Sequence, residues 1–314
     1  MNFRTELTPN ASAWHIGYDS HLLALGSCFA ERIGERLRES RFSVLQNPFG
    51  VIFHPLPMLE LWQRALHAQP LPPESIIFQE EMWRSFLLHS RHAAPTESEL
   101  HATWAETTAQ VRHTLAQKKP VVMLTFGTAV GYEHLETGRI VANNHRLPAA
   151  AFRRGLSPLA ELTAAYQAFF EDFLPKNPSL RVLLTVSPVR HTRETLPLNG
   201  ASKATLRLLC HTLAEKYPQQ VAYFPAYELL MDDLRDYRFY ADDLVHPSPM
   251  AEAYIWQKFS QTYFLPDTQE LLRQWQEVRK ALGHRPLHPE SAATRLHQQQ
   301  LQEKLAQLEA RFRQ

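Results

Sequence analysis

The sequence predicts an α/β fold in which a mainly parallel sheet of about five strands is covered by helices on both faces. Short apolar runs alternate along the chain with longer segments of helical periodicity, a pattern typical of parallel sheets built from strand–helix–strand units. Several runs end in glycine or in a Ser-Pro pair, and ligand sites in such sheets lie at the carboxyl ends of the strands. The expected strands cover residues 22–25, 42–45, 121–126, 181–186 and 221–224.

The first strand leads directly into a helix. Phe29, Ile33 and Leu37 share one helical face, and charged residues lie between them, so Gly26-Ser27 is expected to form a tight turn from strand to helix. Further helices are expected before each of the last three strands, near residues 101–118, 158–174 and 202–216.

Two long inserts, at about residues 51–100 and 129–157, interrupt this alternation. The second insert contains an expected β-hairpin, with strands at 132–135 and 139–142 on either side of a Glu-Thr-Gly turn. Because the alternation resumes after each insert, we expect one main domain over residues 1–265.

A C-terminal helical extension is expected over residues 266–314. Before it, Ser248 and Pro249 are typical of the N-cap and the first residue of a helix. The extension is polar and rich in glutamine from Glu290 onward, and its apolar residues recur over fewer heptads than a coiled coil needs. We expect a helix that lies on its own domain or, alternatively, supports weak homo-oligomerisation. The apolar residues are Leu301, Leu305, Leu308 and Phe312.

The composition is that of an ordinary globular enzyme, with 44% hydrophobic and 21% charged residues. A net charge of +1 gives no overall field that favours nucleic acid or an anionic membrane, so we expect neither as a partner. The N-terminal segment lacks the pattern of a secretory signal, and no run reaches the roughly 18 apolar residues of a membrane span. Cys28 and Cys210 are the only cysteines, too few for a disulfide framework, and a cytoplasmic, reduced protein is expected.

Two groups of residues could together form a hydrolytic site. Ser27 follows the first strand at a helix start, where backbone N–H groups can face an oxyanion, although serine at this position is commonly only the N-cap. Asp243 precedes His246 by three residues, so its carboxylate can orient the imidazole and leave Nε2 to activate a serine. The alternative is a surface Asp–His pair before a helix.

Other reactive residues carry less weight. Cys28 could itself attack as a thiolate, but no basic residue stands next to it, and a small buried cysteine is the preferred interpretation. His89, which precedes Ser90, could line a pocket or belong to a strand edge. No His-x-x-x-His pair with a carboxylate partner occurs among the histidines, so we expect neither a metal site nor a cofactor.

Several blocks of sequence resemble a known family. Leu25 to Ala30 reads LGSCFA, the motif after which the GSCFA family is named, and that family is similar to the SGNH/GDSL hydrolases. The resemblance covers most of residues 20–265 and implies a three-layer α/β/α, flavodoxin-like fold. The other matching blocks are Asn47–Gly50, His89-Ser90, Phe126–Thr128, Ala142–His145, Ser187–Val189 and Leu234–Ser248.

The resemblance implies the active site of a serine esterase. Ser27 matches the nucleophile block, and Asp243 with His246 matches the closing block. Gly50 matches the glycine whose N–H joins the oxyanion hole, and Gly127 begins the block after the third strand. We therefore expect hydrolysis of a small ester, such as an O-acyl group on a carbohydrate, through an acyl-Ser27 intermediate.

One block departs from the SGNH pattern. Those enzymes carry Gly-x-Asn after the third strand, whereas this sequence has Gly127-Thr128-Ala129. Because losing one oxyanion donor costs about a hundredfold or more in rate, an enzyme should replace the missing amide. The expected replacement is Asn143 or, second, His145; Asn144 is weaker because the family pattern has cysteine there. The alternative is that these residues merely end a strand.

Three other functions stay open. An acyltransferase would use the same residues, with a sugar alcohol in place of water. The missing amide favours a catalytically silent binding module, whereas the presence of Ser27, Asp243 and His246 argues against it. A scaffold that assembles through the C-terminal helix is the third alternative.

Overall fold

A five-stranded parallel sheet forms the centre of the computed structural model, which describes residues 4–10, 12–193, 195–283 and 291–312. Numbered along the chain, its strands lie in the order 2-1-3-4-5, the flavodoxin-like arrangement, and every neighbouring pair is parallel. The predicted α/β class is confirmed. In spatial order the strands are β2 (Ser43–Gln46), β1 (His21–Gly26), β5 (Pro120–Phe126), β9 (Arg181–Val186) and β10 (Val221–Tyr223).

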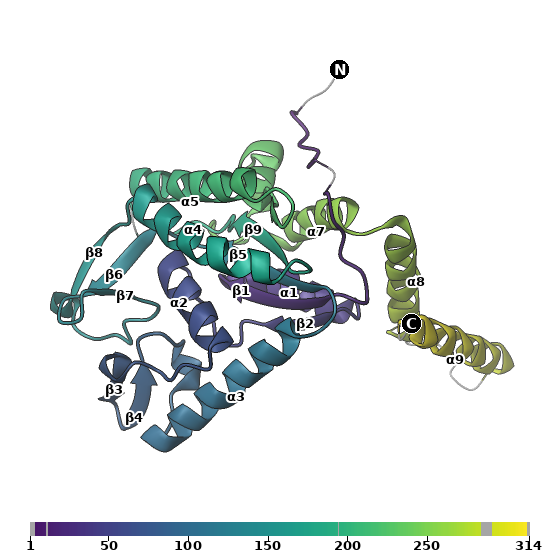
Figure 1. Cartoon of the computed structure of the whole chain (residues 1–314). Helices are drawn as coiled ribbons and strands as arrows, with labels where there is room; N and C mark the ends of the chain where they lie inside the picture. The colour runs from purple at the N-terminus through teal and green to yellow at the C-terminus, as the bar shows by residue number, and fades with distance from the viewer. Residues whose placement is uncertain (1–3, 11, 194, 284–290, 313–314) are drawn as a thin grey trace.

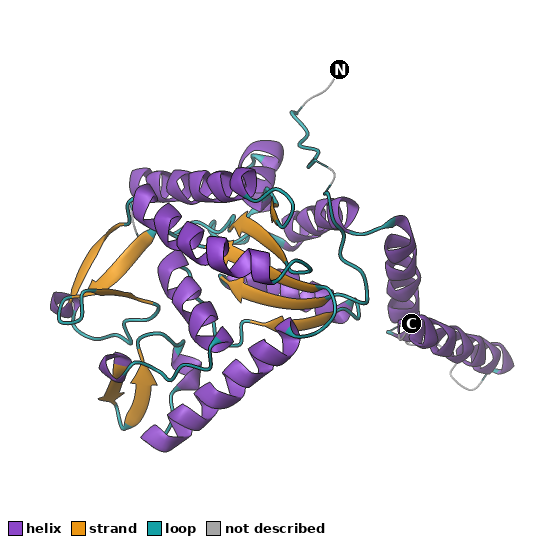
Figure 2. Cartoon of the chain, in the orientation of Figure 1, coloured by secondary structure: helices purple, strands orange, loops and turns teal. Residues whose placement is uncertain are grey.

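Helices cover both faces of this sheet and produce three layers (Figures 1 and 2). Alternate side chains of β1 point to opposite faces: Leu23 and Leu25 belong to one core, whereas Leu22 and Ala24 belong to the other. The first core is closed by α2 (Pro55–Leu66), α3 (Glu97–Leu115), α4 (Leu159–Lys176) and α5 (Leu196–Lys216). The second is closed by α1 (Cys28–Glu39) and α7 (Pro249–Tyr263).

Both expected inserts contain additional β-structure. The first carries the hairpin of β3 (Ile76–Gln79) and β4 (Met82–Ser85). The second forms a separate three-stranded antiparallel sheet of order β7-β6-β8, so the predicted hairpin of β6 (Val130–His134) and β7 (Arg139–Val141) is confirmed. The third strand, β8 (Phe152–Leu156), was not expected, because only Phe152 in it is buried.

Two helices follow the sheet-based body and lie beside it in Figure 1, α8 (Pro266–Leu282) and α9 (Ala292–Phe312). Leu308 of α9 is buried against Leu271 and Val278 of α8, so α9 packs on its own chain. Among the helices of the described residues, none is both long and apolar enough to cross a membrane.

Short helical segments complete the connections. The stretch between β10 and α7 is the one that matters for the site, because it delivers Asp243 and His246 before Ser248 caps α7 as predicted. The segments are η1 (Pro73–Ser75), η2 (Ser90–His92), η3 (Ala149–Ala151), α6 (Ala226–Glu228), η4 (Leu229–Leu234) and η5 (Tyr237–Phe239).

The strand order creates a crevice at one end of the sheet. From β1 the chain crosses one face through α1 to the neighbouring β2, and it later returns to β5 on the opposite side of β1. Ligands in open α/β sheets bind at this kind of switch point, beyond the carboxyl ends of the strands. The turn after β1 and the loop after β5 are therefore where a site is expected.

Candidate active site

The turn from β1 into α1 has a tightly determined shape. Gly26 adopts a φ of +150°, and a β-carbon there would collide with the carbonyl oxygen of Thr125, so glycine is required. Ser27 is still extended, with φ −70° and ψ 177°, and is fully buried. Its Oγ accepts a hydrogen bond from the Phe29 N–H at 3.3 Å, which makes it the N-cap of α1. Cys28 is the first residue of the helix.

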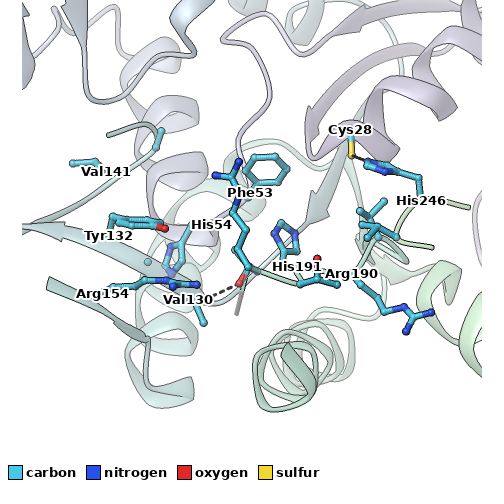
Figure 3. Close-up of a pocket in the computed structure, with 17 residues that line it drawn as sticks. Cys28, Phe53, His54, Val130, Tyr132, Val141, Arg154, Arg190, His191 and His246 are labelled. Carbon is cyan, nitrogen blue, oxygen red and sulfur yellow. Dashed lines mark hydrogen bonds between the residues drawn. The ribbon is translucent and has the colours of Figure 1, made fainter. Parts of the chain in front are cut away.

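Cys28, His246 and Asp243 form a chain of contacts. The Sγ of Cys28 lies 3.5 Å from Nε2 of His246 (Figure 3). Nδ1 of the same imidazole lies 2.6 Å from Oδ2 of Asp243. The other oxygen of Asp243 accepts the backbone N–H groups of Val245 and His246, both at 2.9 Å. The predicted contact between Asp243 and His246 is therefore confirmed.

Hydrogen bonds hold the Asp243 carboxylate ionised. The backbone N–H groups of His246 and Val245 and the His246 side chain together lower the pKa of Asp243 to about 2. A carboxylate that stays charged at neutral pH can orient the imidazole and stabilise its protonated form.

The predicted contact between His246 and Ser27 is wrong, because the imidazole meets the Cys28 thiol instead. Residue 27 precedes the helix, and its side chain folds back over the first turn to cap it. Residue 28 is the first helical position, and its side chain projects into the crevice. The preference of serine for N-cap positions was the sequence signal for this arrangement.

The Cys28 thiol is protonated in its resting environment. Burial raises the pKa of Cys28 and outweighs the backbone N–H groups of Phe29 and Cys28, which favour the thiolate. The Glu31 carboxylate also raises this pKa, and the Lys203 ammonium lowers it. Because only the thiolate is a strong nucleophile, Cys28 needs a base to remove its proton, and His246 is in position to do so.

Cys28 and His246 line a cavity of about 490 Å³. Figure 3 shows these two residues at one end, His191 and Phe53 in the middle, and Tyr132 and Arg154 at the other end. The lining combines the β1–α1 junction, the segment before α2, the second insert and the loop after β9. The volume is in the range of small-molecule sites.

Two histidines in the cavity wall are neutral at physiological pH. Burial lowers the pKa of His54 to about 4, and its Nε2 lies 3.0 Å from Ser157 Oγ. Burial, together with the ammonium of Lys203 and the neighbouring imidazole of His246, also lowers the pKa of His191 to about 4. Nε2 of His191 is buried and has no hydrogen-bond partner among the described residues.

Gly50, predicted for the oxyanion hole, and Gly127, predicted for the same oxyanion or substrate-binding region, use their N–H groups elsewhere. The Gly50 N–H donates to the Asn47 carbonyl oxygen at 2.8 Å, and the Gly127 N–H donates to that of Phe53 at 2.8 Å. Gly50 has a φ of +86°, and a β-carbon there would collide with His89. The structure therefore gives Gly50 and Gly127 roles in turn geometry and close packing rather than as oxyanion donors.

The predicted third donor is also occupied elsewhere. Asn143 donates from Nδ2 to Ser90 Oγ at 3.1 Å, and His145 Nε2 lies 2.7 Å from the Ser85 carbonyl oxygen. His89 caps η2 by accepting the Arg91 N–H on Nδ1. None of Asn143, His145 and His89 lines the cavity. Asn143 and His145 join the two inserts to each other, so their assignment to the oxyanion hole is wrong, as is the expectation that His89 lines the pocket.

The sequence reasoning missed most of the cavity wall. His54, His191, Arg154 and Arg193 line it. His54 precedes α2, Arg154 lies on β8, and His191 and Arg193 share the loop after β9, so no motif spacing joins the three segments. Lys203, on α5, is 1% exposed and donates from Nζ to the carbonyl oxygens of Gly127 and Ser187, both at 2.7 Å. Among the described residues, no group of three or more His, Cys, Asp or Glu side chains is placed to hold a metal ion.

Comparisons with known proteins identify a family. No curated protein matches the chain. A similar solved structure, described as "a putative platelet activating factor from Streptococcus pneumonia", has 12% sequence identity and a TM-score of 0.40 over 77% of this chain and 83% of that one. Residues 275–314 match the C-terminal domain of GSCFA domain proteins. Residues 21–259 match the GSCFA family model, and the chain therefore belongs to the GSCFA family.

Proposed function

We propose that the chain is an acyl-transfer enzyme that hydrolyses a small ester or thioester through Cys28, with His246 as general base and Asp243 orienting the imidazole. The observation that carries the proposal is the unbroken contact from Cys28 Sγ through the imidazole to the Asp243 carboxylate, at 3.5 Å and 2.6 Å. The contact lies at the mouth of a cavity, at the switch point of the sheet.

Formation of an acyl-enzyme begins with proton transfer. His246 Nε2 takes the thiol proton of Cys28 as Sγ adds to the substrate carbonyl carbon, and the carbonyl π electrons move to the oxygen. When this tetrahedral adduct collapses, the bond to the leaving oxygen or sulfur breaks, and the imidazolium returns its proton to the leaving group. The product is a thioester on Cys28.

Hydrolysis of the thioester uses the same histidine. Water attacks the acyl carbon, His246 takes a proton from the water, and a second tetrahedral adduct forms. Its collapse breaks the bond between carbon and Sγ, releases the acid and returns the proton to the thiol. An alcohol in place of water would make the reaction an acyltransfer, so the same residues support both outcomes.

The negatively charged oxygen of the tetrahedral adduct can accept a hydrogen bond from the backbone at the start of α1. The Cys28 N–H lies in the first turn of α1, where backbone N–H groups have no intrahelical acceptor and the helix dipole favours negative charge. His191 lines the same cavity, but its Nε2 is buried beside Gly127, so this histidine is not assigned as a second donor.

We also infer that the family is a branch of the SGNH/GDSL superfamily. The flavodoxin-like strand order and an Asp-x-x-His segment before the last helix of the main domain support this relationship. The nucleophile in this branch would be the cysteine that follows Ser27. A carbohydrate O-acyl group stays one possible substrate, and a binding module is the alternative if no turnover is found.

The test compares turnover of matched cysteine variants. We expect Cys28→Ala to abolish hydrolysis of activated esters and thioesters, such as p-nitrophenyl and thiophenyl acetate, whereas Cys210→Ala should keep it. Cys210 is fully buried in α5 and serves as the control for loss of a thiol. Turnover that survives in Cys28→Ala, or is absent from the wild-type chain with every ester and thioester tried, would contradict the proposal.

A further inference from the structure

Positive charge gathers around the cavity. Three arginines, Arg154, Arg190 and Arg193, are among its lining residues, whereas no described lining residue is Asp or Glu. The guanidinium of Arg190 lies over the rings of Tyr237 and Tyr240, at 5.1 Å and 4.3 Å from their centroids. Arg154 and Arg193 are exposed, so a ligand in the cavity can reach them. Arginine stays charged at all physiological pH values.

A buried cation adds to this field. Lys203 lies beneath the carboxyl ends of β5 and β9, where its ammonium group binds the carbonyl oxygens of Gly127 and Ser187. Its charge partly offsets the rise that burial causes in the pKa of Cys28, and it adds to the lowering of the pKa of His191 by burial. Buried charges are screened little by salt, so Lys203 raises the potential inside the cavity.

The end of the cavity that lies away from Cys28 has a defined shape. Arg154 extends from β8, and its guanidinium carbon lies 5.6 Å from the centroid of the Tyr132 ring on β6. Figure 3 shows Arg154 and Tyr132 across the cavity from Cys28 and His246. Stacking on an aromatic ring restricts the guanidinium, and its planar fork suits a carboxylate or a phosphate.

We propose that the end of the cavity formed by Arg154 and Tyr132 binds an anionic group of the substrate, a carboxylate or a phosphate, carried at a distance from the carbonyl that Cys28 attacks. The position of the reacting carbonyl rests on the proposed function, whereas anion binding itself does not. Arg154 binds the anion against Tyr132, Arg193 supplies a second cation, and Lys203 strengthens the field from below. The preferred substrate is therefore an ester or thioester with a negatively charged acyl chain or leaving group.

Calorimetric titration of the Cys28→Ala chain tests anion binding without turnover. The ligands are glutarate, inorganic phosphate and the neutral analogue glutaramide, and the variants added to Cys28→Ala are Arg154→Gln, Arg154→Lys, Arg193→Gln and Arg153→Gln. We expect at least one anion to bind, about tenfold or more weakening in Arg154→Gln, which corresponds to about 1.4 kcal/mol, and partial recovery in Arg154→Lys. Comparison of glutarate with phosphate identifies which anion the site prefers.

Arg153 provides the matched control. It is the neighbouring residue on β8, points to the other face and pairs with Glu133 outside the cavity, at 2.6 Å. Arg153→Gln should therefore bind anions as the parent does. The proposal is overturned if neither anion binds better than glutaramide, or if Arg154→Gln and Arg153→Gln bind them equally well. If the Cys28→Ala chain binds anions but the wild-type chain shows no turnover, this proposal still holds and only the proposed function is contradicted.

Discussion

The histidine at the mouth of the cavity and the two histidines in its wall are in opposite environments. His246 at the mouth has 48% of its side chain exposed and carries a carboxylate partner, Asp243. In the wall, His54 is buried and His191 is partly buried, and the loss of solvent lowers the pKa of each to about 4. The comparison shows how one residue type can provide two functions. Access to water and a carboxylate suit a histidine that exchanges protons, whereas burial keeps the others neutral.

Removal of His246 should give the largest effect. General base catalysis contributes roughly 10²- to 10⁴-fold to a rate, so His246→Ala should lower kcat/KM by about that factor. The matched control is His101→Ala, because His101 is a partly exposed residue of α3 that does not line the cavity. Steady-state kinetics on both variants check this prediction. Similar rates for the two variants would show that His246 is not the base.

Removal of the Asp243 charge should have a smaller effect. Asp243→Asn keeps the shape of the side chain but cannot stabilise the imidazolium. We expect kcat to fall roughly 10- to 100-fold. This fall is smaller than the one expected for a buried triad, because the Asp243–His246 pair is half exposed and solvent screens its interaction. Asp242→Asn, at the adjacent position, is the control and should retain wild-type kcat. If Asp242→Asn is the slower enzyme, the orienting residue has been assigned wrongly.

Acid pH should destabilise the chain through its buried histidines. The unfolded chain binds a proton at His54 near pH 6.5, whereas the folded chain does so only near pH 4. Because the unfolded state binds more protons in this window, stability is fully present above pH 6.5 and is lost as the pH falls toward 4. Urea unfolding between pH 7 and 4.5 should show a shallower pH dependence for His54→Gln than for wild type. Parallel curves would contradict the neutral assignment.

The smallest effect on activity is expected at Ser27. Ser27→Ala removes the N-cap of α1 and should lower the free energy of unfolding by about 1 kcal/mol, while kcat stays within a few-fold of wild type. Chemical denaturation and steady-state kinetics measure the two effects separately. If a Ser27→Ala chain folds normally but loses its activity, Ser27 rather than Cys28 would be the nucleophile.

The sheet could be predicted because its strands are continuous apolar runs. Every position of β5 is buried, and β9 has a single partly exposed residue, so their composition alone distinguishes them from loops. β8 contains FRRGL and buries only Phe152, and its strand conformation depends on pairing with β6. Elements of this kind are determined by tertiary contacts that a local pattern does not contain.

The part of the candidate site that lies within one short segment of sequence could be predicted. Asp243 and His246 are three residues apart, and the spacing alone brings carboxylate and imidazole together. The choice between Ser27 and Cys28 depends instead on which residue begins the helix, a difference of one position that redirects the side chain. The sequence could not predict that Arg154 and His191 line the same cavity, because only the fold brings their segments together.

The most direct test of the account is to identify the residue that carries the acyl group. The wild-type chain would be exposed briefly to p-nitrophenyl acetate, quenched in acid and digested, and the peptide that contains both Ser27 and Cys28 would be sequenced by tandem mass spectrometry. We predict an acetyl group on Cys28, absent from the His246→Ala chain treated in the same way. An acetyl group on Ser27, with Cys28 unmodified, would contradict the central claim that the thiol facing His246 is the nucleophile.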